Sequence, residues 1–274
     1  MNNDLLNVFG GTGFIGSEYC NIYSNCIIQD RTDRKPKTSN LLYFISTVDN
    51  YNVFENTLLD VETNLKILCE VLEFCKEGNI TINFISSWFV YGDTDMPANE
   101  DSICYPKGFY SITKKAAEDL LISFCKTFKQ NYRILRLCNA IGTGDKKVSK
   151  KKNAIGYMID LLKKNEMVSL YDNGTPSRDI LHVSDICSAI NLICEKGRIN
   201  EIYNIGRGES TEIGYIINKA KKLLNSKSEI KYIDATEFHK IVQVKNFAMN
   251  TFKIKKLGFV PNLSIDEIIN DLCL

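Results

Sequence analysis

A short apolar run, LLNVF, leads directly into the glycine-rich sequence GGTGFIG, which is followed by residues of helical character. Gly10, Gly13 and Gly16 are spaced G-x-x-G-x-x-G, a pattern that allows a tight turn and lets the backbone approach a ligand closely. A helix that begins immediately after such a loop offers free N–H groups and the positive end of its dipole to a pyrophosphate. The order strand, loop, helix therefore predicts a dinucleotide-binding loop, with a purely structural glycine loop as the alternative.

The rest of the first half alternates apolar runs of strand length with segments of helical spacing. This alternation is typical of a parallel sheet covered by helices on both faces. Strands are expected at 5–9, 26–30, 40–47, 80–87 and 132–142, and helices after the glycine loop, over 59–79, where Gly78 can close the C-terminus, and over 109–128. The predicted fold class is α/β, a Rossmann-type doubly wound parallel sheet with a smaller C-terminal substrate-binding lobe.

The character of the chain changes beyond residue 144, where helical segments alternate with shorter strands and a basic loop. Two parts of the second half are therefore expected to form the lobe, interleaved with the last pieces of the first domain. Residues 1–145 and about 181–205 are assigned to the NAD(P)-binding Rossmann domain, and about 146–180 and 206–274 to the substrate lobe.

Composition narrows the classes of partner. The chain has 34 Lys and Arg against 33 Asp and Glu, without the basic excess that a nucleic-acid or anionic-membrane partner usually requires. The 10 cysteines form no CxxC pair and no zinc pattern, so we expect reduced packing cysteines and no metal. The chain shows no signal peptide and no apolar run near the roughly 18 residues of a membrane span. A cytoplasmic location is expected.

An acidic residue ends the second expected strand. Asp30 lies 20 residues after Gly10, where its carboxylate can hydrogen-bond the hydroxyls of an adenine ribose. A carboxylate would repel a 2′-phosphate, which favours NAD. Arg31, Arg34 and Lys35 follow, and they either attract such a phosphate or form a solvated basic loop. The expected cofactor is NAD, with NADP as the alternative.

Tyr110 and Lys114 are four residues apart in FYSITKKAAEDLL, which places both side chains on one face of a helix. A nearby ammonium group lowers the pKa of a phenol, so this tyrosine can exchange a proton with a sugar hydroxyl. The preceding strand ends in Ser86 and Ser87, and a serine there can hydrogen-bond the same substrate oxygen. The three side chains predict a proton-transfer site.

Motifs in this order resemble, through nearly the whole chain, those of the extended short-chain dehydrogenase/reductases, the NAD-dependent epimerase/dehydratase group that acts on sugar nucleotides. GGTGFIG is similar to the cofactor loop of that family and FYSITKKAAE to its Tyr-Lys helix. ISSWFVYG resembles the segment with the catalytic Ser or Thr, here Ser87. LRLCNAIGTGD resembles the segment whose asparagine, here Asn139, contacts the nucleotide diphosphate, and DNGTPSRDILHVSDI the stretch whose arginine, here Arg178, clamps the phosphates.

Two further segments resemble parts of the family's cofactor site. YFIST is similar to the strand end beside the nicotinamide, and ETNLKILCEVLE to a helix whose conserved asparagine is here Asn64. The complete expected site consists of catalytic Ser87, Tyr110 and Lys114; cofactor-binding Gly10, Gly13, Phe14, Ile15, Gly16, Asp30, Arg31, Ser46, Thr47, Asn64, Tyr110 and Lys114; and substrate-binding Ser87, Trp88, Asn139 and Arg178.

The chain also departs from the family pattern. The segment between Asp30 and the third strand is short, and Trp88 and Phe89 stand where the 4,6-dehydratases of the family carry an Asp and a Glu. This argues against 4,6-dehydration, and the aromatic pair either stacks on the sugar or packs in the core. Several other polar residues are interpreted as structural or solvated: Cys104, His182, His239, and the lysines 146, 147, 150, 151 and 152, which alternatively line the nucleotide entrance.

The resemblance implies a nucleotide-sugar epimerase that oxidises the sugar transiently at carbon 4. The alternatives are an NAD(P)H-dependent 4-ketoreductase with the same residues, a redox enzyme for a non-sugar substrate, and a non-catalytic NAD(P)-binding sensor or scaffold. Arg178 and Asn139 argue against a non-sugar substrate, because a neutral molecule needs no residues that bind phosphates. The presence of Ser87, Tyr110 and Lys114 argues against the non-catalytic scaffold. The resemblance also implies a homodimer that pairs through two helices of each subunit.

Overall fold

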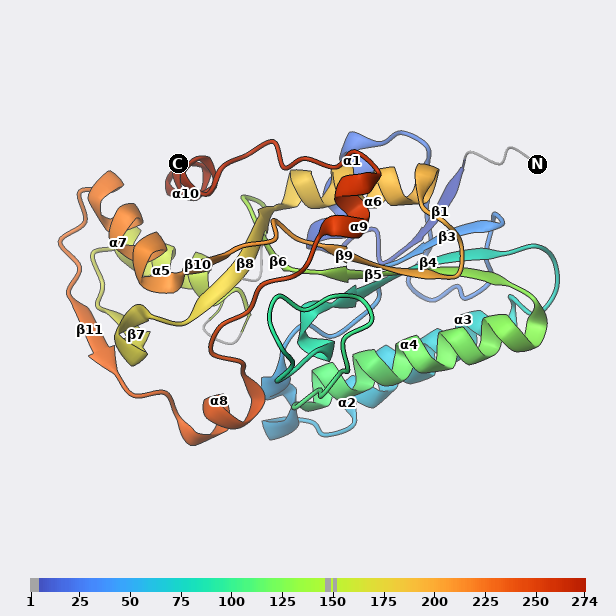
Figure 1. The fold of residues 1–274 in the computed structure, drawn as a ribbon, viewed down its shortest axis with the longest axis horizontal. Helices are drawn as coiled ribbons and strands as arrows, with labels where there is room; N and C mark the ends of the chain where they lie inside the picture. The colour runs from blue at the N-terminus through green and yellow to red at the C-terminus, as the bar shows by residue number, and fades with distance from the viewer. Residues whose placement is uncertain (1–4, 146–148, 150–151) are drawn as a thin grey trace.

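A six-stranded parallel sheet forms the centre of the computed structural model, which describes residues 5–145, 149 and 152–274 (Figure 1). The strand order is β2-β1-β3-β4-β5-β9, and every neighbouring pair is parallel. The strands are β1 (Leu6–Phe9), β2 (Cys26–Ile28), β3 (Asn40–Tyr43), β4 (Thr81–Ser87), β5 (Asn131–Leu137) and β9 (Glu201–Ile205). The expected doubly wound α/β fold is confirmed. The chain reverses direction across the sheet at β1, and the carboxyl end of a sheet at such a switch point is where ligands bind.

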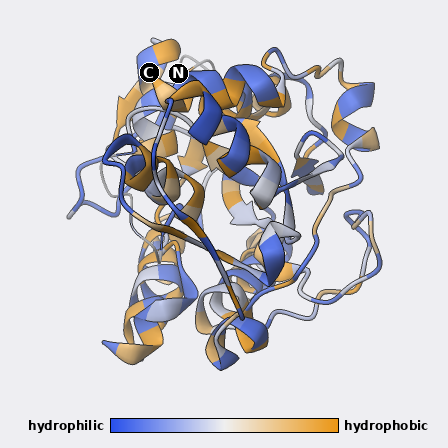
Figure 2. Cartoon of the chain, turned by 90° about the vertical axis from the view of Figure 1, so that its left-hand side faces the viewer, coloured by the Kyte–Doolittle hydropathy of each residue, from blue (hydrophilic) through white to orange (hydrophobic). Residues whose placement is uncertain are grey.

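Helices cover both faces of this sheet. In Figure 1, α1 (Phe14–Ile22) and α6 (Val183–Lys196) lie on one side, and α2 (Leu59–Val61), α3 (Ile67–Glu73) and α4 (Phe109–Phe128) on the other. Alternate residues of β3 point to opposite cores: Leu42 packs with the first layer, and Leu41 and Tyr43 with the second. Hydrophilic and hydrophobic residues accordingly occupy different sides of the helices in Figure 2.

The helix expected over 59–79 is shorter and less regular than predicted. A π-helical turn, η2 (Glu62–Lys66), separates α2 from α3, and the helix ends at Glu73. The amides of Phe74 and Cys75 bond to carbonyls three residues back, at 3.1 and 2.8 Å, which tightens and closes the last turn. Gly78 therefore lies beyond the helix end and does not cap it.

The second half builds a smaller lobe with its own core. Its elements are β6 (Asn139–Ile141), β8 (Ser177–His182) and β10 (Ser210–Glu212) in one sheet, β7 (Val168–Tyr171) and β11 (Ile230–Ile233) in another, and the helices α5 (Ala154–Lys163), α7 (Ile213–Leu223), α8 (Glu237–Val242) and α10 (Ile265–Cys273). In Figure 1 this lobe lies to the left of the large sheet, with α8 at the lower edge beneath it.

The chain crosses between the two parts more often than the sequence suggested. The segment that ends in α9 (Phe252–Lys256) lies in the range assigned to the lobe, yet Phe247, Met249 and Ile254 pack in the core of the large sheet. The reason is Asp179, a fully buried carboxylate of β8 that accepts backbone N–H groups of Arg207, Gly208 and Met249. These bonds hold three distant segments together.

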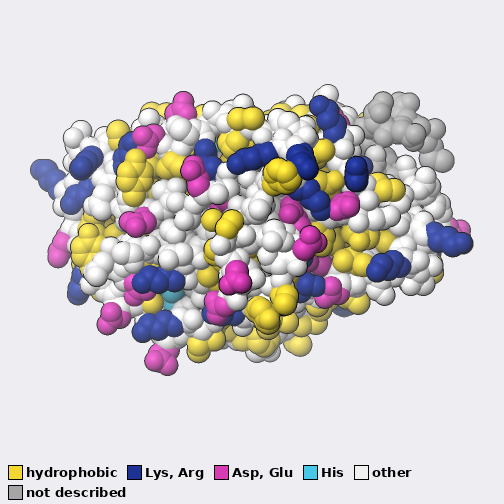
Figure 3. Space-filling view, viewed as in Figure 1, with side chains coloured by type: hydrophobic (Ala, Val, Ile, Leu, Met, Phe, Trp, Pro, Cys, Tyr) yellow, Lys and Arg dark blue, Asp and Glu magenta, His cyan; other side chains and the backbone are white. Residues whose placement is uncertain are grey.

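The surface carries mixed charge. On the face shown in Figure 3, basic and acidic side chains are interspersed. No helix in the described ranges has both the length and the apolar character needed to cross a bilayer.

Candidate active site

A cleft of about 1150 Å³ opens at the carboxyl ends of β1, β3 and β4. It is lined on one side by the glycine loop and the ends of these strands, and on the other by residues of the lobe. Single small-molecule sites usually occupy roughly 300–1,000 Å³. The cleft is therefore large enough to hold two ligands end to end.

The glycine loop forms the cradle that the sequence predicted. Gly10 has φ +80°, and a Cβ on Gly16 would lie 2.5 Å from the Gly10 carbonyl oxygen, so neither position accepts another residue without strain. A Cβ on Gly13 would meet only that same oxygen, at 3.4 Å, which leaves space above the loop. The loop ends at the N-terminus of α1, and this arrangement fits a dinucleotide pyrophosphate.

Asp30, Arg31, Phe14 and Ile15 line the same arm of the cleft. The backbone N–H and the hydroxyl of Thr32 donate hydrogen bonds to the exposed Asp30 carboxylate and lower its pKa. It therefore stays ionised at the position expected for an adenine ribose. By contrast, Arg34 is bound to Glu70 at 2.8 Å and to the Arg31 carbonyl at 2.7 Å, so it is already engaged within the protein.

The residues predicted to lie beside the nicotinamide have two different positions in the structure. Ser46 and Thr47 line the cleft, whereas Asn64 is 2% exposed and does not reach it. The Asn64 carbonyl accepts from the Ser46 hydroxyl and the Thr47 amide, and its amino group donates to the hydroxyls of Thr47 and Thr113. The structure places Asn64 behind the lining of the cleft, and its expected contact with the cofactor stays a prediction. Because its amide is fully used, Asn64 fixes the β3 end against α4.

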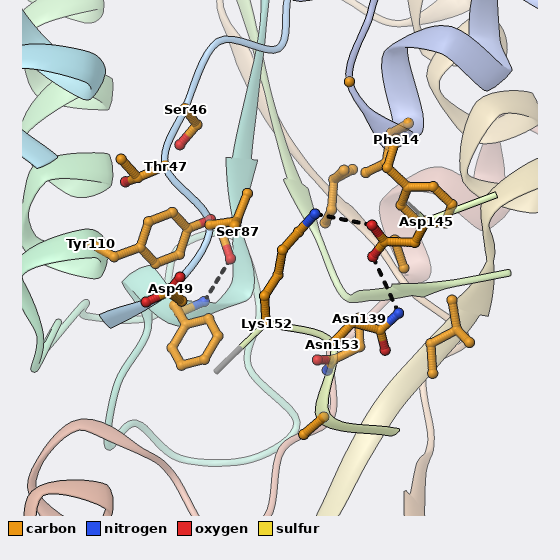
Figure 4. A pocket seen from close by; sticks show the side chains of 18 of the residues that line it. Phe14, Ser46, Thr47, Asp49, Ser87, Tyr110, Asn139, Asp145, Lys152 and Asn153 are labelled. Carbon is orange, nitrogen blue, oxygen red and sulfur yellow. Dashed lines mark hydrogen bonds and ion pairs between the residues drawn. The ribbon is translucent and has the colours of Figure 1, made fainter. Parts of the chain in front are cut away.

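Tyr110 and Ser87 meet in the middle of the cleft (Figure 4). Tyr110 is only 8% exposed, and burial raises the pKa of its phenol to about 12. Hydrogen bonding with Ser87 and Ser46 opposes this rise, while the negative charges of Asp60 and Asp49 add to it. Ser87 is the last residue of β4, and Ser46 lies three residues beyond the end of β3, so neighbouring strands of the sheet lead to both serines.

The Lys114 ammonium is bound to the backbone of β4 and is not among the groups that shift the pKa of Tyr110. Its ammonium donates to the Ile85 carbonyl at 2.6 Å and lies 4.3 Å from the centre of the Phe84 ring. Burial lowers the pKa of Lys114 to about 7, and the charge of Glu118 opposes that effect. The expected lowering of the Tyr110 pKa by Lys114 is therefore wrong for this structure, because desolvation is the largest effect at both groups.

The other arm of the cleft contains the residues expected to bind a diphosphate. Asn139 lines it and donates to the Asp179 carbonyl, and Arg178 lines it with its guanidinium held by the carbonyls of Ser177 and Lys245. Burial lowers the pKa of Arg178 to about 10, which still leaves it cationic at neutral pH. The Arg178 guanidinium lies 5.3 Å from the Trp88 ring centre.

Trp88 is a core residue at the edge of this arm. It is 2% exposed and stacks on Phe89, with ring centres 4.0 Å apart, and on Phe247 at 4.5 Å. Its packing supports the structural interpretation of the aromatic pair, although the edge of Trp88 reaches the cleft. Phe89 is less buried, and its ring stands edge-on to Tyr110 at 5.9 Å.

Several residues of the cleft lie outside the site expected from the sequence, although Lys152 belongs to the lysine run that was alternatively expected to line the nucleotide entrance. Asp145, Lys152 and Asn153 form a bonded group at the N-terminus of α5, drawn with dashed lines in Figure 4. His239 was expected at the surface, but it lines the cleft with its ring 4.7 Å from that of Tyr171. The local sequence around Asp145, Asn153 and His239 does not predict that they line the cleft. Their positions depend on contacts between segments that are distant in the chain. Of the lysine run, residues 146, 147, 150 and 151 lie outside the described ranges.

His182 and Cys104, which the sequence analysis interpreted as structural, do not line the cleft. His182 bonds to the hydroxyl of Ser184 at 2.6 Å and to Asp271 at 3.3 Å, so it joins β8, α6 and α10. Cys104 does not line the cleft; it packs against the large core, and burial raises the pKa of its thiol.

The class of protein is defined by a Rossmann-type sheet with a cleft at its carboxyl edge and Tyr110 in the lining of that cleft. A sequence profile of the NAD dependent epimerase/dehydratase family matches residues 39–206, which is more than half of the chain. The chain belongs to this family, as its motifs indicated. The expected nicotinamide cofactor is confirmed at the level of the family.

Individual relatives differ in their reactions. The chain is 29% identical to a dTDP-D-glucose 4,6-dehydratase of Dictyostelium discoideum, over 80% of this chain and 61% of that protein. It is 25% identical to the dTDP-4-dehydro-6-deoxyglucose reductase of Escherichia coli, over 81% of this chain and 68% of that protein. A UDP-glucose 4-epimerase structure from Thermotoga maritima superposes with a TM-score of 0.85 at 21% identity and covers 97% of each chain. The similarity thus supports a nucleotide-sugar enzyme family and leaves the reaction open.

Proposed function

We propose that this protein is an NAD-dependent nucleotide-sugar epimerase that oxidises its substrate transiently at carbon 4. The observation that carries the proposal is that Tyr110 lines a two-armed cleft together with Ser87 and Ser46. The arm with the glycine loop and Asp30 suits NAD. The arm with Asn139 and Arg178 suits a diphosphate that carries the sugar.

In the proposed reaction, Tyr110 accepts the proton of the sugar hydroxyl, and Ser87 hydrogen-bonds the same oxygen. Bound NAD supplies the redox chemistry, because its nicotinamide accepts a hydride and can give it back. Lys114 holds the nicotinamide ribose, which requires it to leave the Ile85 carbonyl. Its positive charge then stabilises the phenolate of Tyr110. Tyr110 then returns its proton to the same oxygen, and if the keto sugar has turned its other face to the cofactor, the overall reaction would be an inversion at carbon 4 with no net change in redox state.

A 4,6-dehydratase is a poorer match to the site, although one of the relatives is named as such. Removal of a sugar hydroxyl as water needs an acid and a base beside the catalytic serine. The two residues after Ser87 are Trp88 and Phe89, which are stacked on each other and cannot transfer protons.

The second candidate is a 4-ketoreductase, which would run half of the same reaction. A reductase is among the relatives, and the substrate lobe is small. Tyr110 would then donate its proton to the keto oxygen. Ser87 and Lys114 would keep their roles, so the residues of the site do not distinguish the two candidates. The cofactor that the purified protein retains does distinguish them.

The purified protein is therefore expected to retain NAD. Denaturing it and assaying the released nucleotide should yield close to one NAD per chain, because an epimerase restores its cofactor in every turnover. A protein that is empty as purified, and that oxidises NADPH only when a 4-keto sugar nucleotide is added, would identify the reductase instead. Failure to bind either nucleotide would contradict the role given to the glycine loop.

We also propose a homodimer that pairs through α4 and its neighbour α3. Phe109, Ile112, Leu120 and Phe128 form an apolar stripe along α4, between 36% and 46% exposed. In Figure 1, α4 runs along the lower edge of the large part of the protein, with α3 and α2 beside it. The expected result is the molar mass of two chains in light scattering, and a monomer after Ile112→Glu. A monomeric wild-type protein at micromolar concentration would contradict this proposal.

A further inference from the structure

A buried carboxylate lies behind the wall of the cleft. Asp60 of α2 is 0% exposed and does not itself line the cleft, and α2 packs against α4, the helix that carries Tyr110. Its Oδ1 accepts hydrogen bonds from the Thr47 hydroxyl and, at 3.2 Å, from Nδ2 of Asn52 in the 3-10 helix η1 (Asn50–Phe54). Among the described residues its Oδ2 has no hydrogen-bond partner. Because the group is buried, solvent ions screen its charge much less than that of an exposed carboxylate.

The fold stabilises the negative charge of Asp60 and does not compensate it with the lysine of the site. Asp60 lies in the first turn of a helical stretch that continues from α2 through η2 into α3, where the positive end of the helix dipole favours an anion. The Lys114 ammonium is bound to the Ile85 carbonyl, and the charge that acts on its pKa is that of Glu118. Lys114 therefore leaves the charge of Asp60 free to act on its surroundings.

Thr47 carries this charge to the surface of the cleft. It lines the cleft, and Figure 4 shows it with Ser46 beside Tyr110. Its hydroxyl oxygen accepts Nδ2 of Asn64 at 2.9 Å and directs its proton to Asp60. A hydroxyl that donates its proton to a carboxylate is polarised, and its oxygen becomes more negative. The charge of Asp60 also acts through space on the Tyr110 phenol.

The proposed reaction requires the nicotinamide ring to lie in the field of Asp60. The sugar carbon that loses its hydride bears the hydroxyl bonded to Tyr110, so the ring that accepts the hydride lies next to this tyrosine. The oxidised ring carries a positive charge and the reduced ring is neutral, so a fixed negative charge stabilises the oxidised form alone. Lys114 beside the ribose has the opposite effect, which Asp60 offsets.

We propose that the buried carboxylate of Asp60 sets the oxidation state in which the protein holds its cofactor: through Thr47 and through space, it favours the binding of NAD over NADH. This inference rests on the proposed function and adds to it a positioning residue that touches neither ligand. An epimerase begins each turnover with the oxidised cofactor, so this preference keeps the protein ready for its substrate.

The test measures which form of the cofactor the whole protein selects, with no sugar present. Purified protein is equilibrated with an equimolar mixture of isotopically labelled NAD and NADH, separated from free nucleotide and denatured, and the released labelled forms are assayed. Contacts that both forms share, such as those of the glycine loop, cancel in the ratio of NAD to NADH. Wild-type protein is expected to release more NAD than NADH.

Asp60→Asn removes the charge and keeps the shape of the side chain. Its carboxamide oxygen can still accept the hydrogen bonds from Thr47 and Asn52. The ratio of NAD to NADH is expected to fall about tenfold, in line with the loss of one unit charge close to a partly desolvated site. Thr47→Val, the second variant, removes the hydroxyl that links Asp60 to the cleft and should change the ratio in the same direction.

The matched control is Asp185→Asn on α6. Asp185 is also 0% exposed, accepts hydrogen bonds from Asn262 and Leu263, and does not line the cleft. This variant removes an equally buried charge at another place, so it should lower the melting temperature and keep the wild-type ratio of NAD to NADH.

Equal release of NAD and NADH by the wild-type protein would overturn the inference. A wild-type ratio in Asp60→Asn or, if that variant does not fold, in Thr47→Val would do the same and would assign Asp60 a purely structural role. These outcomes are separable from the proposed reaction. A protein that selects NAD through Asp60 but oxidises no sugar nucleotide contradicts only the epimerase proposal. Epimerisation by a protein whose ratio does not depend on Asp60 contradicts only this inference, and capture of neither nucleotide contradicts both.

Discussion

Replacing Tyr110 with phenylalanine is expected to lower kcat by roughly 10²–10⁴-fold, the usual contribution of a positioned acid or base. The change removes one oxygen and keeps the buried ring and its edge-on contact with Phe89. NAD and sugar-nucleotide binding should change little. Hydride transfer in a single turnover, followed by the absorbance of the reduced nicotinamide, measures the effect on the chemical step.

The control is Tyr105→Phe, which makes the same chemical change five residues earlier. Tyr105 is 55% exposed and does not line the cleft, so its hydroxyl has no role in proton transfer. A Tyr110→Phe protein with wild-type single-turnover rates would exclude the proposed mechanism.

The same site predicts the sign of the pH dependence. Oxidation of the sugar needs Tyr110 as phenolate and Lys114 as ammonium, and their pKa values in the free protein are about 12 and about 7. Below pH 7 only the phenolate fraction changes, so kcat/KM should rise about tenfold per pH unit. Above pH 7 the growing phenolate fraction is offset by loss of the Lys114 proton, so the profile should level off. A profile that falls with rising pH below 7 would contradict the assignment of the base.

The sequence predicted best those parts of the fold that depend on local pattern. The helix that carries Tyr110 and Lys114 begins and ends at the expected residues, Phe109 and Phe128, because its spacing and its good helix formers agree. The glycine loop is defined by steric limits that only glycine meets. The candidate proton-transfer set combines this helix with Ser87 at the end of β4, against which α4 packs.

Other parts depended on contacts between distant residues. β7 and β8 are separated only by the short turn segment DNGTP, yet they do not pair with each other: β7 pairs with β11, and β8 with β6 and β10. Polar residues such as Asn50 and His239 have no local signal, because their burial is set by η1 and α8 meeting across the cleft. The pKa of Tyr110 could not be predicted either, since it depends on desolvation and not on sequence spacing.

The last prediction concerns a buried ion pair below the site. Glu118 and Arg136 are 0% and 2% exposed, and the carboxylate accepts two hydrogen bonds from the guanidinium, at 3.0 and 2.7 Å. Burial would lower the pKa of Arg136, but the bond and charge of Glu118 raise it instead. Glu118 also accepts the hydroxyl of Ser86 at 2.6 Å, which anchors the strand end that presents Ser87.

Glu118→Gln is expected to lower the free energy of unfolding by about 3–5 kcal/mol, because it leaves the Arg136 charge buried without its counter-ion. Urea unfolding followed by circular dichroism measures this difference. The matched control is Asp119→Asn on the same helix, where the exposed pair with Lys115 should contribute less than about 1 kcal/mol.

A double variant, Glu118→Gln with Arg136→Met, separates charge burial from packing. It should recover much of the lost stability, since removing both charges abolishes the unpaired one. Activity should not recover to the same extent, because Ser86 and Lys114 lose the carboxylate on which they depend. Equal losses of stability for Glu118→Gln and Asp119→Asn would show that the pair contributes no more than a surface contact. Full activity in the double variant would show that Glu118 does not position Ser87 and Lys114.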